Sequence, residues 1–557
     1  MIFTSFCDWI HNNIKNITFT DELFCEIKDV FHYFLENKTT EIDSSFFSKI
    51  HSKDKQKLMG ITYTPQEIRK ELIVNTISNI EKNILENKTF CDPCCGSGTF
   101  SIDIAEILHK KNISYENIFN NLIFQKDKDK ISILLSLANL FIFLRQKDVS
   151  IEKIYPNVEH IDFFESKEKY DFYITNPPYI KIQNLDEETK TDLKTKYADV
   201  FSGSLGISPL FIYKMLKDAN EDGVVAVITQ NNIFTSNAAE KIRKKFANHI
   251  FLVKAFGHQK KFKNIGAYTC LMFLSKKENK NFTYIKDDDS SIMSNIELDH
   301  KKWRLGNNTD INLIKKIENN GVKITDLCDI FVGIATLKDK AYTVFNHSGI
   351  WYSTSPDNNL YPIESDLVKP LIKVSDISTE EDIHKNSRGV IFPYEVIKGK
   401  FSLIEESKFR RLYKDTYHAL TLWKKELNNR SSVKKNNHPW YQWGRHQGMT
   451  PINNKLLTKT FNKGPNFLLD STYSLISNGY GISIKNKDID ILFIQKILNS
   501  QFFENYIRKT SYEIDGDYQC YQKNFIEKFR IPSELLLKQN EILEKNINID
   551  DIIADYY

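Results

Sequence analysis

Apolar residues recur at helical spacing near the start of the chain. In residues 1–57 they return every three or four positions, which places them on one face of a helix. This pattern predicts an N-terminal helical segment of short amphipathic helices, with an apolar face formed by Phe24, Ile27, Val30, Phe31 and Phe34.

The pattern changes between residues 58 and 300, where short apolar runs alternate with helix-length segments. A helix is expected after Pro65. Strands are expected at residues 89–91, 122–124, 158–161, 172–174 and 224–228. Two later runs, residues 251–256 and 268–274, are joined by a polar loop and are expected to pair antiparallel at the sheet edge. Because helix-length connections are typical of parallel crossovers, we expect an α/β, Rossmann-like domain with a mixed, mainly parallel sheet.

A polar stretch, residues 279–320, separates two parts of different character. It contains three consecutive aspartates and several serines, which favours a linker. Residues 320–535 then carry irregular strand-like runs, many aromatic and basic residues, and no second alternation of strands and helices. We expect a separate C-terminal α+β domain there, followed by a tail at residues 536–557.

The composition is that of a globular protein. Of 557 residues, 41% are hydrophobic and 27% are charged, which argues against a disordered or membrane chain. The net charge of +4 permits a polyanionic partner without requiring one. Cys91, Cys94 and Cys95 lie close together, but no second CxxC or paired histidine follows at zinc-site spacing, so no metal site is expected. No apolar span of about 18 residues and no secretory start are present, so no membrane partner is expected.

A strand that ends in an acid leads into a glycine-rich turn and then a helix at residues 90–100. Asp92 ends the strand, and Gly96 and Gly98 lie in the turn. Glycines let the backbone pass close to a ligand, and a helix N-terminus favours a negative group, so the turn indicates a nucleotide-like cofactor. Asp127 ends the next strand, where an acid can accept hydrogen bonds from ribose hydroxyls. Without the glycine turn, a solvated surface acid would be the better interpretation of Asp127.

A second motif, Asn176, Pro177, Pro178 and Tyr179, follows a later strand. The two prolines fix the backbone, so that the Pro177 carbonyl can face a ligand. The Asn176 amide and this carbonyl are matched acceptors for an exocyclic amine, and the Tyr179 ring offers a flat surface for a base taken out of its duplex. Asn and Pro are also common in ordinary turns, and the motif gains its weight from the cofactor turn that precedes it.

Together these segments resemble the N6-adenine DNA methyltransferases of the gamma arrangement, the TaqI-like group, over residues 59–532. In that group, cofactor motifs precede NPPY and a recognition domain follows. The resemblance implies S-adenosylmethionine as cofactor, with binding residues Tyr63, Thr64, Pro65, Asp92, Cys94, Gly96, Gly98, Asp127, Asp162 and Phe163. It places Phe262 as an aromatic residue that helps to hold the flipped base, with Phe256 as a nearby alternative. The family often has a small residue where Gln125 and Lys126 stand.

The resemblance implies methyl transfer to N6 of a flipped-out adenine in double-stranded DNA. Asn176 and Pro177 would hold the amine, Tyr179 would stack on the base, and direct displacement would need no covalent enzyme intermediate. Outside the cofactor turn, no cysteine lies in the Pro-Cys arrangement of cytosine C5 methyltransferases, and Cys94 is expected to be structural. The implied setting is the bacterial cytoplasm at the nucleoid, as a monomer, with a cognate restriction endonuclease as a candidate partner.

The second domain opens with residues 331–342, which resemble the start of the family's recognition domain. Further on, residues 440–446 mix aromatic side chains with hydrogen-bond donors. Arg and Gln can read purine edges, but a buried aromatic cluster explains the same pattern equally well. The sequence therefore assigns no single base-reading residue.

Other functions stay open on the sequence. RNA or protein-glutamine N-methyltransferases can use a related Asn-Pro-Pro loop, although the long segment after the linker argues against the glutamine case. A non-catalytic DNA-binding protein is a further alternative, against which the two intact motifs argue. A nuclease site is not expected, because the nearest upstream acid to the Glu26 and Lys28 pair, Asp21, lies in the same helical pattern.

Overall fold

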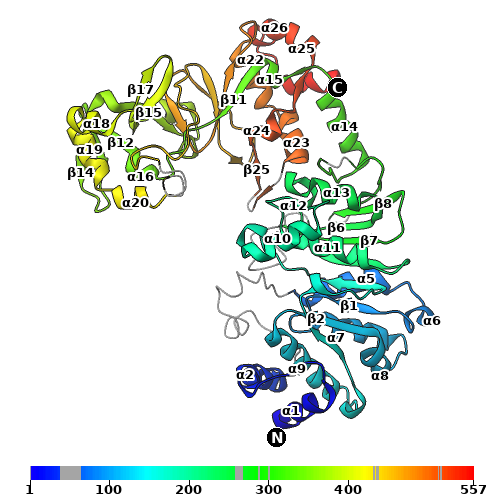
Figure 1. Ribbon diagram of the computed structural model, residues 1–557. Helices are drawn as coiled ribbons and strands as arrows, with labels where there is room; N and C mark the ends of the chain where they lie inside the picture. Colours follow the sequence, from blue (N-terminus) through cyan, green and yellow to red (C-terminus); the bar gives the residue numbers. More distant parts are fainter. Residues whose placement is uncertain are drawn as a thin grey trace. The chain divides into compact units, whose positions relative to one another are not determined.

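The computed structural model describes residues 2–37, 64–256, 268–286, 289–298, 301–430, 433, 438–511, 513–514 and 517–557. The chain divides into two compact units, Met1–Asn308 and Thr309–Tyr557 (Figure 1). This division falls inside the polar stretch that the sequence predicts as a linker. In the described parts of the chain, no helix is long and apolar enough to span a membrane.

The described residues of the first unit form one sheet of nine strands, in the order β3-β2-β1-β4-β5-β7-β6-β8-β9. The strands are β1 (Phe90–Asp92), β2 (Ile123–Asp127), β3 (Asn157–His160), β4 (Phe172–Thr175), β5 (Val224–Gln230), β6 (Ile250–Ala255), β7 (Thr269–Ser275), β8 (Asn281–Lys286) and β9 (Asp289–Ser294). The strands β1 to β5 pair in parallel. The expected α/β fold with a mixed, mainly parallel sheet is therefore confirmed.

The far end of the sheet differs from the sequence prediction. The strands β6 and β7 pair antiparallel as expected. They do not form the edge, because β8 and β9 extend the sheet beyond them. These two strands come from residues that were expected to be linker. Phe282 and Tyr284 of β8 are buried at a spacing of two, so a strand pattern was present but was outweighed by the polar composition.

Helices cover both faces of the sheet (Figure 1). On one face, α5 (Gln66–Ile77), α7 (Thr99–Lys110) and α9 (Lys130–Gln146) share a hydrophobic cluster with Phe172 and Ile174 of β4. On the other face, α11 (Ile207–Asp218) packs through Phe211 against Phe163, which in turn contacts Tyr173. Successive β4 side chains thus point to opposite faces, as a strand requires.

The N-terminal helices α1 (Ile2–Asn13) and α2 (Asp21–Asn37) pack on the outer side of α9. Residues 131–144 of α9 are buried without interruption, since the helix is covered on its outer side as well as by the sheet. The Phe6 ring lies 5.4 Å from that of Phe141, and Trp9 Nε1 donates to the Ile151 carbonyl at 3.0 Å. The described part of residues 1–57 is therefore integrated into the first unit and is not a separate segment.

The second unit combines small sheets with short helices, which confirms the expected α+β class. Its two larger sheets in the described residues have the orders β11-β23-β19-β21 and β14-β13-β12-β16-β15-β22. Their strands are β11 (Cys328–Val332), β12 (Thr343–His347), β13 (Ile350–Thr354), β14 (Leu360–Ile363), β15 (Val368–Lys373), β16 (Arg388–Ile391), β19 (Lys455–Thr458), β21 (Leu468–Asp470), β22 (Leu475–Ser477) and β23 (Tyr480–Ile484). The main helices are α14 (Asn308–Asn319), α16 (Asp339–Tyr342), α18 (Glu406–Leu412), α19 (Lys414–Thr421), α20 (Lys424–Asn428), α22 (Ile491–Leu498), α23 (Gln501–Thr510), α25 (Ser533–Leu537) and α26 (Gln539–Glu544).

The end of the chain, expected as a tail at residues 536–557, belongs to a core of the second unit. Ile542, Ile549 and Ile553 are buried in one cluster with residues of α22 and α23. Apolar residues recur throughout this stretch, but their pattern does not say which surface covers them. They are buried because α22 and α23 provide the surface against which they pack.

Candidate active site

The glycine-rich turn joins the end of β1 to the start of α7. Gly96 and Gly98 have φ angles of 54° and 74°, in the left-handed region that favours glycine. Cys95 N donates to the Lys126 carbonyl at 2.9 Å, and Gly96 N donates to Asp127 Oδ2 at 3.0 Å. The turn is thus fixed to β2, and the free N–H groups of the first turn of α7 adjoin it.

Side chains of α9 and β2 support the turn, and the sequence did not reveal them. Ser136 donates to Gln125 Oε1, and Asn139 Nδ2 donates to the Ser97 carbonyl at 2.9 Å. A Cβ on Gly98 would lie 2.9 Å from Ser136 Cβ, closer than a side chain tolerates. The available signal was the few polar residues, Ser132, Ser136 and Asn139, within the long apolar run of this helix. Gln125, one of the departures from the family pattern, therefore fills the space next to the turn.

The carboxyl group of Asp92 is enclosed at the end of β1 and is 2% exposed. Its Oδ1 accepts hydrogen bonds from Thr175 Oγ1 at 2.7 Å and from Cys94 N at 3.3 Å. Its Oδ2 has no partner among the residues that the structure describes. Burial raises the pKa of Asp92 to about 7. A buried acceptor without a partner is costly, and a cationic ligand group would satisfy it.

Asp127 and Asp162 follow the carboxyl ends of β2 and β3. Besides the Gly96 amide, Asp127 accepts a hydrogen bond from Asp129 N at 2.9 Å, and burial raises the pKa of Asp127 to about 6. Asp162 accepts from Phe164 N at 3.0 Å and so begins a short helical turn. Both carboxylates therefore lie, like Asp92, at the carboxyl ends of the parallel strands, where open α/β sheets bind their ligands.

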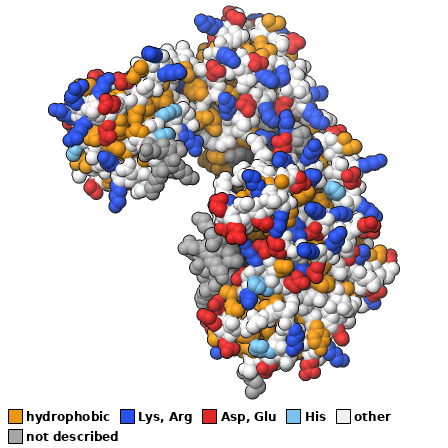
Figure 2. Space-filling model, viewed as in Figure 1, with side chains coloured by type: hydrophobic (Ala, Val, Ile, Leu, Met, Phe, Trp, Pro, Cys, Tyr) orange, Lys and Arg blue, Asp and Glu red, His pale blue; other side chains and the backbone are white. Residues whose placement is uncertain are grey.

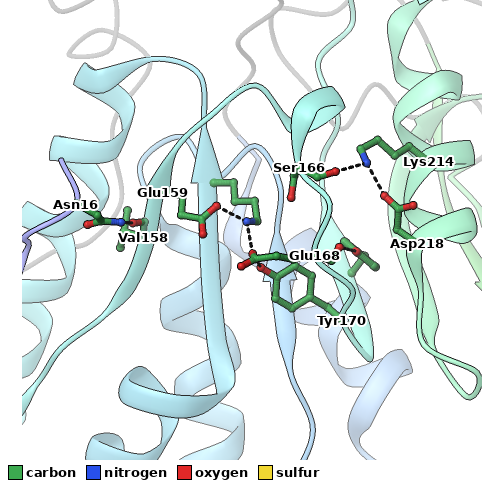
Figure 3. Close-up of polar contacts among 10 residues, drawn as sticks. Asn16, Val158, Glu159, Ser166, Glu168, Tyr170, Lys214 and Asp218 are labelled. Atoms are coloured by element: carbon green, nitrogen blue, oxygen red, sulfur yellow. Dashed lines mark hydrogen bonds and ion pairs between the residues drawn. The ribbon is translucent and has the colours of Figure 1, made fainter. Parts of the chain in front are cut away.

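The loop that carries Asp162, residues 161–171, is tied to β2 and β3 on one side (Figure 3). The buried Lys126 of β2 forms ion pairs with Glu159 of β3 and Glu168 of the loop. Tyr170 OH donates to the same Glu168 carboxylate. Lys126, the second departure from the family pattern, thus connects two strands and this loop through one ammonium group.

On its other side the same loop is tied to α11 (Figure 3). Lys214 Nζ donates to the Ser166 carbonyl at 2.7 Å and to Asp218 Oδ2 at 2.5 Å. The same ammonium lies 4.9 Å from the centre of the Phe163 ring, which is 2% exposed. The Phe163 side chain is therefore buried between α11 and β4, and Asp162 just before it follows the end of β3.

The NPPY motif follows β4 directly. Asn176 Oδ1 accepts a hydrogen bond from Tyr179 OH at 2.7 Å, and this hydroxyl lies 3.2 Å from the Ile228 carbonyl of β5. Burial raises the pKa of Tyr179, so its hydroxyl stays protonated and acts as donor. In the described parts of the chain, no hydrogen bond reaches the Pro177 carbonyl. Asn176 Oδ1 and the Pro177 carbonyl are thus two neighbouring acceptors at the end of one strand.

Thr64 sets the orientation of the Asn176 amide. Asn176 Nδ2 donates to Thr64 Oγ1 at 3.0 Å, which leaves the amide oxygen to face the other way. Arg69 of α5 donates to the Thr64 carbonyl and pairs with Asp103 of α7 at 2.7 Å, and both of these side chains are buried. The residue that orients Asn176 is therefore linked to the helix that begins at the glycine turn.

Cys94 joins the two motifs. Its Sγ lies 3.0 Å from Thr175 Oγ1 and 3.5 Å from the Asn176 carbonyl. Burial raises the pKa of Cys94, so the thiol is neutral and is not a nucleophile. This contact fits the structural role expected of Cys94.

The remaining predicted residues are less informative. Pro65 precedes the first turn of α5, where its fixed φ starts the helix. Phe256 is buried in the main core of the first unit. Tyr63 and Phe262 lie outside the described residues.

A sequence model of the family described as N-6 DNA methylase matches residues 45–329, more than half of the chain. The chain belongs to the N-6 DNA methylase family. The matched residues include the glycine turn, Asp127, Asp162 and the NPPY motif. S-adenosylmethionine is the cofactor of this family and fold, as the sequence resemblance implied.

Several relatives of this N-6 DNA methylase are restriction-modification proteins, and a shorter match covers 28% of the chain with a release factor glutamine methyltransferase of Clostridium botulinum at 27% identity. It is 26% identical to the type II restriction enzyme and methyltransferase RM.Eco57I of Escherichia coli over 86% of its own chain, and it spans 57% of that protein's length. It is 24% identical to the type II methyltransferase M.BanIII of Aneurinibacillus aneurinilyticus, with 81% of this chain and 86% of the relative covered. Among solved structures it is similar to the Type IIL restriction-modification enzyme MmeI in complex with DNA, with a TM-score of 0.62 and 12% identity over 91% of this chain and 75% of that one. At this identity the likeness to MmeI shows the fold alone.

The aromatic stretch of the second unit is mainly a core element of this N-6 DNA methylase. Trp440, Tyr441 and Trp443 are buried in one hydrophobic cluster, so the alternative of a buried aromatic cluster is correct for them. The reason is that three rings within four positions pack best against one another and their neighbours. Arg445 and His446 at the end of the stretch are exposed.

Proposed function

We propose that this N-6 DNA methylase is a site-specific DNA methyltransferase that transfers a methyl group to N6 of a flipped-out adenine in double-stranded DNA. The observation that carries the proposal is the hydrogen bond of 2.7 Å between Thr175 and Asp92. Thr175 directly precedes Asn176, and Asp92 ends the strand before the glycine turn. A cofactor held at the turn and an amine held by Asn176 and Pro177 would therefore be neighbours.

The chain offers a matching group for each part of S-adenosylmethionine. The buried Asp92 Oδ2, which has no partner among the described residues, suits the ammonium of the methionine part. Among the residues that the structure describes, no neighbouring side chain fills the space beside Gly96, so a ligand can approach that backbone closely. Asp127 would accept from the ribose hydroxyls, and Asp162 would accept from the amino group of the cofactor's adenine.

Asn176 and Pro177 would prepare the amine for transfer. Adenine N6 is a weak nucleophile because its lone pair is delocalised into the ring. Two hydrogen bonds, from N6 to Asn176 Oδ1 and to the Pro177 carbonyl, would favour tetrahedral nitrogen and localise that pair. When bound, S-adenosylmethionine supplies the electrophilic methyl group. Because both acceptors are neutral oxygens and weak bases, the amine proton would leave to solvent after the new C–N bond forms.

Tyr179 would serve the base in two ways. Its ring offers a stacking surface, as the sequence suggested. Its hydroxyl contacts Asn176 Oδ1, and a carbonyl-type oxygen has two lone pairs, so this bond and one from N6 are compatible. Phe262 would be the second aromatic wall.

Direct methyl-transfer assays test this proposal. Purified protein is incubated with tritiated S-adenosylmethionine and duplex DNA, RNA or a cell protein extract, and the products are digested and separated. We expect label in N6-methyladenine from duplex DNA only. Label confined to RNA or to protein glutamine would refute the proposal in favour of those alternatives, and DNA binding without transfer would favour a non-catalytic protein.

Sequencing of modified bases would define the partner DNA and the biological setting. A host with and without the gene is expected to differ at one adenine context throughout its genome. Survival of the host without the gene would separate an orphan enzyme from one paired with a restriction endonuclease, the candidate protein partner. A monomer is expected in either case.

Cofactor affinity should weaken as the pH falls from 7.5 to 6.0. The pKa of Asp92 is raised to about 7, so the carboxylate is mostly neutral at pH 6.0 and must lose its proton to bind the ammonium. We expect a Kd about eightfold higher at pH 6.0, since proton and cation compete for one site. Isothermal titration calorimetry in buffers of different ionisation enthalpy should also record proton release on binding.

The matched control is Asp92→Asn, which keeps the shape and removes the titration. This variant should bind the cofactor weakly and with little change between pH 6.0 and 7.5. The comparison stops at pH 7.5 because an α-amino group begins to lose its own proton above that value. Equal wild-type Kd values at the two pH values would rule out an ionic role for Asp92.

A further inference from the structure

The surface of the protein mixes charges of both signs. Figure 2 shows Lys and Arg side chains interspersed with Asp and Glu on the face in view. The net charge of the chain is only +4. Recognition of DNA by such a protein depends on local features more than on one broad basic field.

Two segments of the second unit form one rigid surface, here called the paired loops: residues 333–338 and residues 444–448. Arg445 N donates to the Ala335 carbonyl at 3.1 Å, and Gly444 N donates to the Thr336 carbonyl at 3.0 Å. Gln447 Nε2 donates to the Gly333 carbonyl at 2.9 Å. The paired loops are therefore joined by backbone hydrogen bonds, with an antiparallel β-bridge between Ala335 and Arg445.

A buried arginine supports the paired loops. Arg430 is 7% exposed. Its guanidinium donates to the carbonyls of Thr336 at 2.7 Å, Trp440 at 2.7 Å and Gln442 at 2.8 Å. One cation thus fixes the first loop and the chain that leads into the second. Such support gives exposed side chains on the loops a defined position.

Leu337 is strained and exposed at the tip of the first loop. Its φ is 59°, and of the ten described non-glycine residues with positive φ it is the one with a branched apolar side chain. The left-handed conformation disfavours such a residue, and Gly or Asn would occupy it more easily. Leu337 nevertheless stays 45% exposed. A Cβ built on Gly444 would lie only 2.7 Å from the Leu337 Cβ. Leu337 therefore fits beside position 444 because that position is a glycine. Packing on Gly444 covers only part of the Leu337 side chain, and strain at a side chain that stays this exposed points to function.

Arg445 lies next to Leu337 on the second loop and is exposed. The neighbouring carboxylate, Asp339, accepts a hydrogen bond from Thr336 Oγ1 at 2.5 Å. Lys338 lies 5.3 Å from the Trp423 ring and adds a second positive charge to this surface. An apolar side chain suits contact with a base step, and a nearby guanidinium suits a purine edge or a phosphate. The paired loops hold both kinds of group in fixed positions.

We propose that the paired loops read the target DNA, with Leu337 as a wedge against one base step and Arg445 as a donor to a purine edge. The inference rests on the proposed function, because it assumes that the chain acts on duplex DNA. It adds which residues of the second unit determine the site.

The test compares Leu337→Gly and Arg445→Ala with the wild type on a duplex that carries the modified site. Glycine removes the strain, so Leu337→Gly should unfold at the same or a higher temperature while its kcat/KM falls about tenfold, the loss expected of one base-step contact. A 2-aminopurine placed at each step of the site should report unstacking at one step by the wild type and none by Leu337→Gly. Arg445→Ala should lose about tenfold discrimination against substitution at one base pair.

The controls are exposed residues elsewhere in the second unit, Leu360→Ser and Arg411→Ala, which should match the wild type in every assay. A lower unfolding temperature with unchanged kcat/KM would show that Leu337 is structural, and this would overturn the inference. Changed self-association with unchanged DNA methylation would assign the paired loops to contacts between copies instead. A wild type that methylates no DNA would refute the proposed function itself, whereas an active wild type with two unchanged variants refutes the paired loops alone.

Discussion

Replacement of Asn176 by Ala is expected to lower kcat by a factor of about 100 to 1,000, the usual effect of removing one precisely placed polar contact to a reacting group. The variant loses the Oδ1 acceptor and leaves the Pro177 carbonyl to hold the amine alone. Cofactor binding should change by less than about threefold, because Thr64 alone among the described residues proposed to bind it has a hydrogen bond to the Asn176 side chain, and its backbone is held by Arg69. Single-turnover transfer to duplex DNA and calorimetric cofactor binding measure the two effects separately.

Two conservative variants make this test sharper. Thr64→Val removes the acceptor that orients the amide through Nδ2, and an intermediate loss of about tenfold is expected because the amide could then turn its nitrogen toward N6. Tyr179→Phe keeps the ring and removes the hydroxyl bond to Asn176 Oδ1, so it should be milder than Asn176→Ala. Wild-type turnover in Asn176→Ala would contradict the amine-holding role, whatever the other two variants do.

Replacement of Gly98 by Ala is expected to destabilise the first unit by about 2 to 5 kcal/mol and to abolish measurable cofactor binding. One part of the cost is the left-handed backbone, with a φ of 74°, which disfavours a Cβ by about 1–2 kcal/mol. The other part is overlap with Ser136, whose Cβ would be 2.9 Å away, and overpacking of this kind costs about 1–3 kcal/mol. Denaturant unfolding and calorimetry with S-adenosylmethionine measure both consequences.

Gly96→Ala is the matched control for Gly98→Ala. Gly96 also has positive φ, at 54°, but no atom of the described residues lies within 4 Å of a Cβ built there. It should therefore show only the backbone cost, about 1–2 kcal/mol. Adding Ser136→Gly to Gly98→Ala should restore part of the stability, since it removes the overlapping atoms. Equal destabilisation by Gly96→Ala and Gly98→Ala would mean that the contact with Ser136 is unimportant.

The central strands β4 and β5 were predictable because each is a short apolar run that becomes buried on both faces. The run at residues 224–228 became β5 (Val224–Gln230), and the run at residues 172–174 became β4 (Phe172–Thr175). The prediction failed where polar side chains hid the period of two, as in β8. It also failed at residues 536–557, because apolar residues there do not reveal the core they join, which is formed with α22 and α23 from earlier in the chain.

The sequence by itself determined the family, the parallel core and the order of the motifs. Those properties follow from local patterns: a glycine turn after an acid, a proline-fixed loop after a strand, and apolar runs of strand length. Only the tertiary structure decided how the motifs work together. The bond between Asp92 and Thr175 joins residues 83 positions apart, and that between Asn176 and Thr64 joins residues 112 apart. No local pattern encodes such pairs, because they depend on which strands lie side by side, and it is the parallel packing of β1 against β4 that places the Asp92 carboxyl beside the strand that ends at Asn176.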